Sequence, residues 1–443
     1  MFKEKYAQGK ALRNKVARTD HSWWEPSADR PPVEKMIELS DYDRLPELIP
    51  IRHFRMMKSP FVFYRATASL MARDLSLTAS AGINVQACGD CHLMNFGCFS
   101  TPERTLIADM NDFDETHPGP WEWDVKRLAT SFMLACRAKG LSEQESTDIT
   151  MRLVTSYQDK VAEYAQMKFL DLWYTKFTIE DLRGLSDNKK FQDRITKVLK
   201  KTEDESHEKT LYKMAESTEA GHKIMDKPPL IYHPVDMQES REMINQFMAN
   251  YKATLQPDRK LLLDQYTLED LALKVVGVGS VGTRCFVVLM MNENNEPLFV
   301  QIKEARPSVL EPFTQPAIYK HQGERIVQGQ RIVQAASDIF LGWSMWNGRH
   351  YYLRQLRDKK VSFEVDSFGK TYLALYARLC GTILARAHCK SAKGPLICGY
   401  MGQGDDFSKA VGRFATVYAD QTEKDYGDFI KAVKTGKLEI KEE

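Results

Sequence analysis

The sequence predicts an α+β fold of two lobes, in which a helical lobe precedes a β-rich lobe along the chain. Residues 141–223 follow a mostly helical pattern. Residues 271–305 are rich in β-branched residues, and glycine clusters and an Asn-rich turn divide them into three strands. A Pro-rich stretch at 226–234 separates the two patterns. A chain of 443 residues is also too long for one compact core.

The chain divides into four segments on this pattern. They are a polar lead-in of irregular or short-helical structure over 1–50, a helical lobe with two polar loops over 51–240, a β-rich lobe over 265–362, and C-terminal helices over 363–443 that return to the helical lobe. The elements expected near the polar loops are a helix over 54–75 with a break at Pro60, a short strand entering a loop over 82–100, a strand and acidic loop over 104–115, and a Pro-Gly turn followed by a helix over 116–140. Later elements are helices over 323–337 and 367–392 and a strand over 349–358.

The charge balance limits the partners. The chain has 62 basic and 60 acidic residues, and its net charge of +2 gives no electrostatic case for nucleic acid as the main partner. It has no long uninterrupted apolar run, so we expect no membrane span. The polar start of the chain lacks the apolar core of a secretory signal, and we therefore expect a cytoplasmic location.

The stretch CGDCHLMNFG, residues 88–97, suggests several kinds of site. Cys88, Cys91 and His92 match the pattern of covalent haem attachment. Cys88 and Cys91, with Cys98 or His92, could also begin a zinc site, and the CxxC pair alone suggests a redox dithiol. Haem attachment belongs to exported compartments, no second CxxC completes a zinc site, and the Gly, Asp and Asn of the stretch favour a loop over a dithiol helix. We interpret the cysteines as packing residues and assign function to the polar residues between them.

Gly277, Gly279 and Gly282 form a GxGxxG motif whose flanks decide its meaning. In a dinucleotide-binding fold a helix follows the third glycine, whereas here TRCFVVLMM, a turn at NENNEP and then LFVQIKEA follow. The glycines therefore cap a β-hairpin, as in the loop with which protein kinases cover the phosphates of ATP. The alternative is that three glycines only relieve a tight hairpin.

Lys303 lies on the third of these strands, where a kinase places the lysine that pairs with the α- and β-phosphates. A helix with a carboxylate partner for that lysine should follow. We predict Glu324 in GERIVQGQRIVQ as the partner, and Glu304 is the alternative. Otherwise Lys303 is an ordinary lysine on the surface of a strand.

Asp90 and Asn95 have the five-residue separation of a kinase catalytic loop. There the Asp orients and deprotonates the acceptor hydroxyl, and the Asn binds metal. Asp112 and Asp114 follow a predicted strand in NDFDE, and clustered carboxylates suit Mg²⁺. The alternative is a solvated acidic turn. We interpret His92 as a structural hydrogen-bonding group rather than the general base.

The order of these elements differs from that of an ordinary kinase, in which the glycine-rich lobe comes first. Here the catalytic elements at 90–114 precede the nucleotide lobe at 277–357. The helix ending LARAHCKSA at 384–392 would ordinarily lead straight into the catalytic loop. The order therefore predicts a circularly permuted kinase-like fold, because permutation is tolerated where the joined ends meet at the surface.

Seven stretches carry a resemblance to a known family: RMMKSPFVFYR, GDCHLMNFG, NDFDETHPGPWEWDVKRLA, KVVGVGSVGTRCFVVL, QAASDIFLGW, RQLRDKK and LARAHCKSA. From about residue 50 to the C-terminal region the chain resembles the bacterial family catalogued as domain of unknown function 2252, which is grouped with the protein-kinase-like superfamily. GDCHLMN and DFDETHPGPWEWDVKRLA are similar to the catalytic and metal segments of aminoglycoside phosphotransferases and choline kinases. This resemblance implies Asp90 as base, Asn95 and Asp112 as metal ligands, and Asp124 as a structural residue that tethers the loop.

Two features depart from the pattern of protein kinases. Gly89 stands before the catalytic Asp in place of an Arg, as in small-molecule kinases, and the helix after Lys303 lacks an unambiguous Glu. Taken together, the residues and the resemblance predict an ATP- and Mg²⁺-dependent phosphotransferase with an unidentified hydroxyl acceptor, a small molecule rather than a protein. The alternatives are a catalytically weak nucleotide-binding pseudokinase and a nucleotidyl transferase that moves AMP. Arg55, Lys58 and Arg65 are candidates for binding an anionic acceptor, although such residues more often cover surface.

Overall fold

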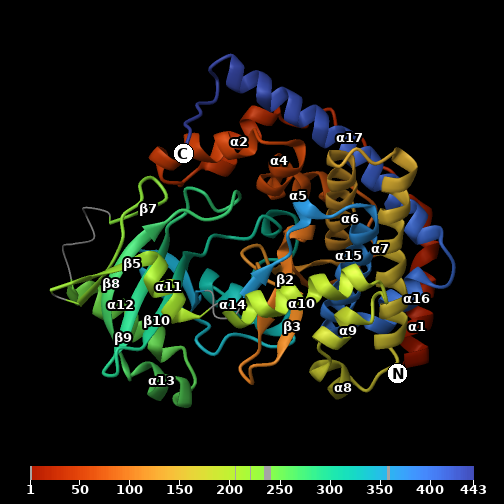
Figure 1. The fold of residues 1–443 in the computed structure, drawn as a ribbon. Coiled ribbons are helices and arrows are strands. Elements are labelled where there is room, and N and C mark those ends of the chain that lie inside the picture. Colours follow the sequence, from red (N-terminus) through yellow and green to blue (C-terminus); the bar gives the residue numbers. More distant parts are fainter. Residues whose placement is uncertain (1, 205, 220, 234–240, 357–359) are drawn as a thin grey trace.

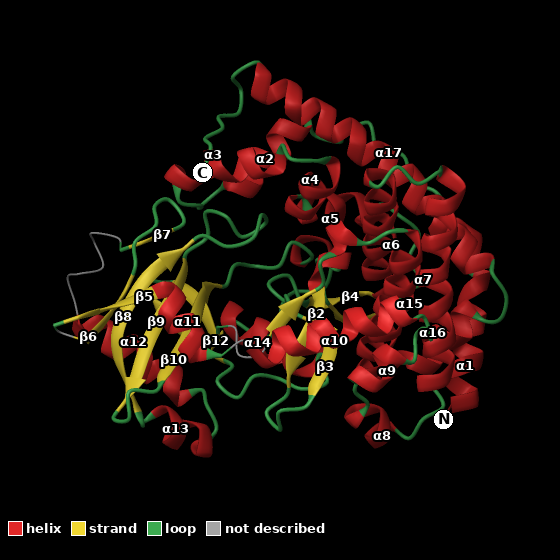
Figure 2. Cartoon of the chain, viewed as in Figure 1, coloured by secondary structure: helices red, strands yellow, loops and turns green. Residues whose placement is uncertain are grey.

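The structure is a computed structural model that describes residues 2–204, 206–219, 221–233, 241–356 and 360–443. The chain contains both helices and strands, and the longest helices and the largest sheet lie at different sides of the molecule, which confirms the α+β class (Figure 1). A large antiparallel sheet and its flanking helices form what we call the sheet region. A bundle built around α6, α7, α15 and α17 forms the helical region (Figure 2).

The main sheet has six antiparallel strands in the order β11-β12-β10-β9-β8-β7. They are β7 (Ile231–Tyr232), β8 (Tyr266–Lys274), β9 (Cys285–Asn292), β10 (Pro297–Glu304), β11 (Gly342–Trp346) and β12 (Arg349–Gln355). The central strands β9 and β10 are buried over almost their whole length, in keeping with their continuous apolar runs. The glycine motif joins β8 to β9, and Lys303 on β10 lies opposite Tyr352 on β12.

Helices cover both faces of this sheet. Alternate residues of its strands point to opposite sides, and apolar side chains on each side pack against helices. On one face, α12 (Arg241–Ala253) and α13 (Pro257–Leu263) pack Phe247, Tyr251 and Leu263 against the sheet. On the other face, α11 (His207–Met214) packs Met214 into a cluster with Phe299. Helix α14 (Gln322–Val333) contacts β11 and β12 as well as β1, so it joins the sheet region to the helical region.

Three smaller sheets complete the strands. They are β1 (Asn84–Ala87) with β4 (His117–Pro120), β13 (Lys360–Ser362) with β2 (Phe96–Ser100) and β3 (Leu106–Met110), and β5 (Ala215–Thr218) with β6 (Gly221–Ile224). The loop 88–95 leaves β1 and enters β2, and the loop 111–115 leaves β3 toward β4. The two loops lie side by side, because the Asn111 N–H donates to the Asn95 carbonyl at 2.8 Å.

Helix α6 (Trp121–Ala138) forms the centre of the helical region and is buried over almost its whole length. Around it lie α7 (Glu143–Tyr164), α15 (Lys370–His388) and α17 (Asp406–Lys434), so the C-terminal helices pack against helices from the first third of the chain. Helix α7 begins at a capping box, in which the Ser142 hydroxyl accepts from the Glu145 N–H and the Glu145 carboxylate accepts from the Ser142 N–H.

The remaining helices are short or peripheral. They are α1 (Phe2–Ala11), α2 (Val33–Asp41), α3 (Ile49–Met56), α4 (Pro60–Ala66), α5 (Ala68–Ser76), α8 (Phe169–Tyr174), α9 (Ile179–Arg183), α10 (Lys189–Asp204) and α16 (Gly394–Met401), with a turn of π-helix at Cys389–Lys393 and 3₁₀ turns at Leu12–Asn14, Arg18–Ser22, Pro46–Leu48, Leu93–Asn95, Glu311–Phe313 and Val365–Ser367. The lead-in over 1–50 is short-helical: α1 packs against α16 in the helical region, whereas Leu45 and Leu48 near its end pack on the core of the sheet region. None of the described helices is both long and apolar enough to cross a membrane.

Most elements lie where the sequence predicts them. Helix α4 begins at Pro60 because proline fits the first turn of a helix and the Ser59 hydroxyl caps it, so the predicted break is the start of a separate helix. The predicted helix over 367–392 is α15 followed by the π-helical turn. The end of the predicted strand over 349–358, and residues 234–240 at the end of the predicted helical lobe, lie outside the described residues.

Candidate active site

A cavity of about 720 Å³ lies where the glycine loop meets the two polar loops. Six of the predicted site residues line it: Asp90, Asn95, Asp112, Asp114, Gly277 and Gly279. Lys303 reaches the same place from β10, because its ammonium contacts both carboxylates of the 111–115 loop. Residues from both polar loops and from the main sheet therefore converge on one cavity, although they are far apart in the sequence.

Lys303 is buried on β10 between two carboxylates. Its Nζ lies 2.5 Å from Asp114 Oδ2 and 3.4 Å from Asp112 Oδ1. Burial alone would lower the pKa of Lys303, but Asp112 and Asp114 raise it well above its usual value, so the ammonium stays charged. The Tyr352 hydroxyl, on the neighbouring strand, donates to Asp114 Oδ1 at 2.6 Å and holds that carboxylate from its other oxygen.

The carboxylate partner of Lys303 differs from the one predicted. In the part of the chain that the structure describes, Lys303 pairs with Asp112 and Asp114, and Glu324 is not among its partners. Glu324 lies in the first turn of α14. The next residue of that helix, Arg325, contacts the acidic loop, because its guanidinium donates to the Asp114 carbonyl at 2.9 Å. The alternative, Glu304, pairs with Arg284 and Arg349. The acidic loop therefore supplies the charge that we expected from a helix.

The glycine loop has the backbone conformations that only glycine adopts easily. Gly277 and Gly282 have positive φ angles of 63° and 84°. A Cβ on Gly279 would lie 3.5 Å from the Arg65 carbonyl, so the tip of the loop approaches that residue closely. Two segments of the chain before α4 fasten the loop: the Leu45 N–H donates to the Gly282 carbonyl at 2.7 Å, and Arg55 donates to the Gly277 carbonyl.

Asp90 is held by a buried arginine beneath its loop. Arg127, on α6, donates to the Asp90 carboxylate from Nε at 2.7 Å, and its guanidinium also donates to the Tyr64 carbonyl and lies over the Tyr64 ring. Burial raises the pKa of Asp90 to about 6, although Arg127 opposes this shift. The pKa of Asp90 is therefore close to neutral pH, which suits a group that exchanges a proton with a substrate.

Asp124 holds the beginning of the same loop. Its two carboxylate oxygens accept from the backbone N–H groups of Cys88 at 2.7 Å and Gly89 at 3.0 Å. His388 Nε2 lies 3.2 Å from one of these oxygens, and the Tyr157 hydroxyl bonds to the other nitrogen of that ring. These contacts fix the backbone immediately before Asp90.

The oxygen donors for a hard cation are present but few. Asn95 Nδ2 donates to the Asp90 carbonyl at 2.6 Å, which leaves the Asn95 amide oxygen as the atom available to a metal. The carboxylate of Asp112 is 41% exposed. No three His, Cys, Asp or Glu side chains among the described residues are grouped so that they could hold a metal ion. Mg²⁺ commonly takes its remaining oxygens from substrate phosphates and water, so these donors fit an ion that arrives with a nucleotide.

The cysteines of the 88–98 stretch are packing residues. All eight cysteines of the chain are buried as free thiols. Burial raises the pKa of Cys98 to about 12 and that of Cys91 well above its usual value, so both stay protonated near neutral pH. His92 has a structural contact, because its Nδ1 accepts from the Met94 N–H at 3.2 Å. The polar residues of the stretch, rather than its sulfurs, line the cavity.

Of the three cations proposed to bind an anionic acceptor, Arg65 lines the cavity. Its Nε is buried and has no hydrogen-bond partner. Asp90 and Asp112 are close enough to raise its pKa, against the lowering that burial causes. Arg55 instead bonds to the glycine loop and to Glu443.

Sequence reasoning missed two residues that shape the site. Arg127 belongs to the predicted helix WEWDVKRLA and is buried in the structure. The sign of its role in the sequence is a charged residue at a position that the helical spacing places on the buried face of that helix. Tyr352 is one of several aromatic residues in RHYYLRQ, and nothing local marks the one that reaches Asp114.

The chain matches the model of a known family. The model of the family described as an uncharacterized protein conserved in bacteria (DUF2252) matches residues 44–432. The match covers most of the chain, so the protein belongs to this family. Comparisons with curated proteins and with solved structures found no match.

Proposed function

We propose that the protein is an ATP- and Mg²⁺-dependent phosphotransferase with a circularly permuted kinase-like fold of two lobes. The observation that carries this proposal is the convergence of a buried strand lysine, an acidic pair and a loop carboxylate on one cavity beneath a glycine loop. The Lys303 Nζ lies within 3.4 Å of a carboxylate oxygen of both Asp112 and Asp114, and Asp90 lines the same cavity. Phosphoryl transfer requires mainly positioning and charge stabilisation, which these residues supply.

In this proposal the glycine loop covers the triphosphate, and the Lys303 ammonium exchanges part of its contact with Asp114 for the α- and β-phosphates. Mg²⁺, held by the Asn95 amide oxygen, Asp112 and Asp114, would neutralise charge on the β- and γ-phosphates. The acceptor hydroxyl would bond to the γ-phosphorus as the bond from that phosphorus to the bridging oxygen of ADP breaks. The hydroxyl proton would pass to the Asp90 carboxylate.

Arg65 has a role in the same proposal. It lies where the tip of the glycine loop approaches, it lines the same cavity as Asp90, and its buried Nε has no hydrogen-bond partner. A guanidinium there would bind the transferring phosphoryl group or an anion on the acceptor, because arginine matches phosphate and carboxylate geometry.

Calorimetric titration with Mg-ATP tests the nucleotide site. We expect the wild type to bind and Lys303→Met to bind at least about tenfold more weakly, which corresponds to a loss of about 1.4 kcal/mol. Lys223→Met, at an exposed lysine of β6, is the matched control and should bind as the wild type does. Absence of binding by the wild type would overturn the proposal.

Labelled ATP then separates the alternatives. Transfer from ATP labelled at the γ position, lost in Asp90→Asn but kept in the exposed-loop control Asp187→Asn, supports phosphotransfer. Transfer from the α position alone identifies a nucleotidyl transferase. Binding without transfer of either label, across a pool of metabolites, identifies a pseudokinase.

A further inference from the structure

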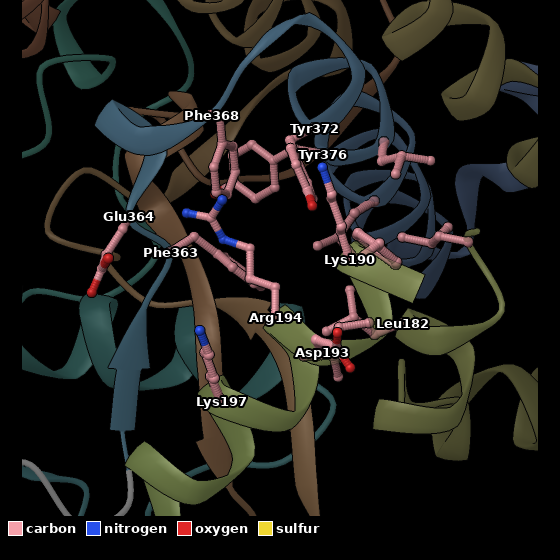
Figure 3. Close-up of a pocket in the computed structure, with 15 residues that line it drawn as sticks. Leu182, Lys190, Asp193, Arg194, Lys197, Phe363, Glu364, Phe368, Tyr372 and Tyr376 are labelled. Carbon is pink, nitrogen blue, oxygen red and sulfur yellow. The ribbon is translucent and has the colours of Figure 1, made fainter. Parts of the chain in front are cut away.

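A second cavity, of about 560 Å³, lies in the helical region. Helices α9, α10 and α15 and the segment 363–368 enclose it (Figure 3). Its volume is within the range of sites for small molecules, about 300 to 1,000 Å³.

The walls of this cavity are apolar and aromatic. Phe191 on α10, Phe368 before α15, and Tyr376 and Leu379 on α15 are all buried and face it. Such walls favour a ligand with a hydrocarbon or aromatic body, because transfer of apolar surface from water into an apolar cavity is favourable.

Three cations lie on one side of this cavity. Lys190, Arg194 and Lys197 are spaced four and three residues apart on α10, so they share one face of that helix. Figure 3 shows Lys190 and Arg194 extending from α10 toward the aromatic side chains of α15. The Arg194 guanidinium lies over the rings of Phe368 and Tyr372, at 4.9 and 5.1 Å from their centroids, and donates to the Ser367 hydroxyl.

The carboxylates at this cavity are fewer than the cations. Asp193 and Glu364 are both exposed at its edge, and the Glu364 carboxylate points away from the cavity in Figure 3. Three cations against two carboxylates, with apolar walls behind them, complement a molecule that has an apolar body and an acidic head.

One wall of this cavity contacts the loop that carries Asp90 and Asn95. The Tyr376 hydroxyl donates to the Leu93 carbonyl at 2.6 Å, in the 3₁₀ turn that ends at Asn95. The rings of Phe363 and Phe368, which also line the cavity, pack against the Tyr376 ring at 5.1 and 5.5 Å. A molecule in the cavity would therefore press on the side chain that holds the catalytic loop.

We propose that this cavity binds an amphipathic anion, an acyl chain of medium length that ends in a carboxylate, and that its occupancy is transmitted to the catalytic loop through Tyr376. The binding part goes beyond the phosphotransferase proposal and does not depend on it. The transmission part rests on that proposal only for its effect on activity, because the loop can be observed directly.

Calorimetric titration with sodium decanoate tests the binding. We expect decanoate to bind the wild type, and the neutral decanol and the cationic decylammonium to bind at least about tenfold more weakly, because they lack the charge that Lys190 and Lys197 attract. Leu185→Trp fills the cavity from its half-buried edge and should abolish binding, with circular dichroism and thermal unfolding as checks that the variant folds.

Paired lysine variants provide the control for charge. Lys190→Gln/Lys197→Gln should weaken decanoate binding several-fold, whereas Lys189→Gln/Lys200→Gln, at exposed lysines of the same helix outside the cavity lining, should leave it unchanged. Equal loss in both pairs, equal binding of decanol and decanoate, or decanoate binding that survives in folded Leu185→Trp would each overturn the binding site.

Hydrogen–deuterium exchange of residues 88–96 tests the transmission. Decanoate should slow exchange there in the wild type, and Tyr376→Phe should remove this slowing while it keeps decanoate binding, because the ring stays and only the hydroxyl that bonds to the Leu93 and Phe96 carbonyls is lost. Binding to the wild type without any change of exchange in 88–96 would overturn the transmission. Neither readout requires turnover of ATP, so failure here is distinct from failure of the phosphotransferase proposal.

Discussion

The two polar loops of the candidate active site are held in different ways. The 88–95 loop is fixed from within the helical region, where Arg127, 2% exposed, pairs with Asp90 and Asp124 accepts from the loop backbone. The 111–115 loop is fixed across the cavity by Lys303, which belongs to the sheet region. The first loop is therefore part of one packed unit, whereas the second also ties two parts of the molecule together.

This difference suggests that the ion pair of the first loop stabilises the fold and that the ion pairs of the second loop can rearrange when a ligand binds. Arg127 also bonds to the Tyr64 carbonyl and is surrounded by protein, so its pairing with Asp90 is a permanent part of the fold. Lys303 contacts two carboxylates that are 41% and 25% exposed, so this ion pair borders solvent in the cavity. Under the proposed function, an incoming phosphate would compete with these carboxylates for the ammonium. The contrast predicts that replacing the arginine costs stability and that replacing the lysine costs ligand binding.

The largest expected effect follows from Arg127→Met. This change removes the buried cation and leaves Asp90 without its partner, and loss of one member of a buried ion pair costs about 3 to 5 kcal/mol. We expect urea denaturation to show that the free energy of unfolding falls by about 4 kcal/mol. Arg152→Met, at an exposed arginine of α7, is the control and should change stability by less than about 0.5 kcal/mol.

Equal stability of Arg127→Met and the wild type would show that Asp90 does not depend on the arginine, and the contrast between the two loops would then disappear. Retained Mg-ATP binding by the folded variant would sharpen it, because it would confine the role of Arg127 to the fold.

Next in size is Gly89→Ala, which tests the contact between the two loops. Gly89 has φ of 84°, and a Cβ there would lie 2.1 Å from the Glu115 carbonyl oxygen. Strain and overpacking together should cost about 3 kcal/mol. Gly277→Ala, at φ of 63° with open space around the Cβ position, has the strain without the clash and should cost only about 1 kcal/mol in the same denaturation experiment. Similar losses in the two variants would mean that the loops separate easily.

Lys303→Met has a smaller expected effect on stability, of about 1 to 2 kcal/mol. Asp112 and Asp114 can recover water when the lysine is removed, and Asp114 keeps its bond from Tyr352. Thermal and urea unfolding measure the change, with Lys223→Met as the exposed control. A loss as large as that of Arg127→Met would show that Lys303 is structural like the arginine, and the proposed division of roles would be wrong.

The sequence was sufficient where the signal is local. The glycine motif, the following hairpin and the strand that carries Lys303 are all legible in one continuous stretch, and the structure has them as β8, β9 and β10. The α+β class followed for the same reason. The roles of Asp90, Asn95, Asp112 and Asp114 in catalysis stay predictions, but their convergence on one cavity is a property of the fold.

Contacts between distant segments could not be predicted in the same way. Glu324 was the nearest helical carboxylate after Lys303 in the sequence, but the fold brings in the acidic loop from much earlier in the chain. Arg127 and Tyr352 reach the site by the same kind of long-range packing. The apolar cavity beside α10 has no motif at all, because its walls come from three separated helices and a loop.

The smallest expected effect concerns pH and tests whether Asp90 is the group that accepts the hydroxyl proton. Burial raises the pKa of Asp90 to about 6, above the value of about 3.9 expected in an unfolded chain. The carboxylate is present above this pKa and lost below it, so turnover of Mg-ATP should be level above pH 6 and should fall about tenfold per pH unit below it.

Glu115 lines the same cavity, and burial raises its pKa to about 7, so it is the competing explanation for an acid limb. Glu115→Gln keeps an oxygen that can accept from the Val309 N–H, and it should leave the limb near pH 6. A limb that disappears in Glu115→Gln would assign the proton to Glu115, and the 88–95 loop would then position the acceptor without accepting its proton.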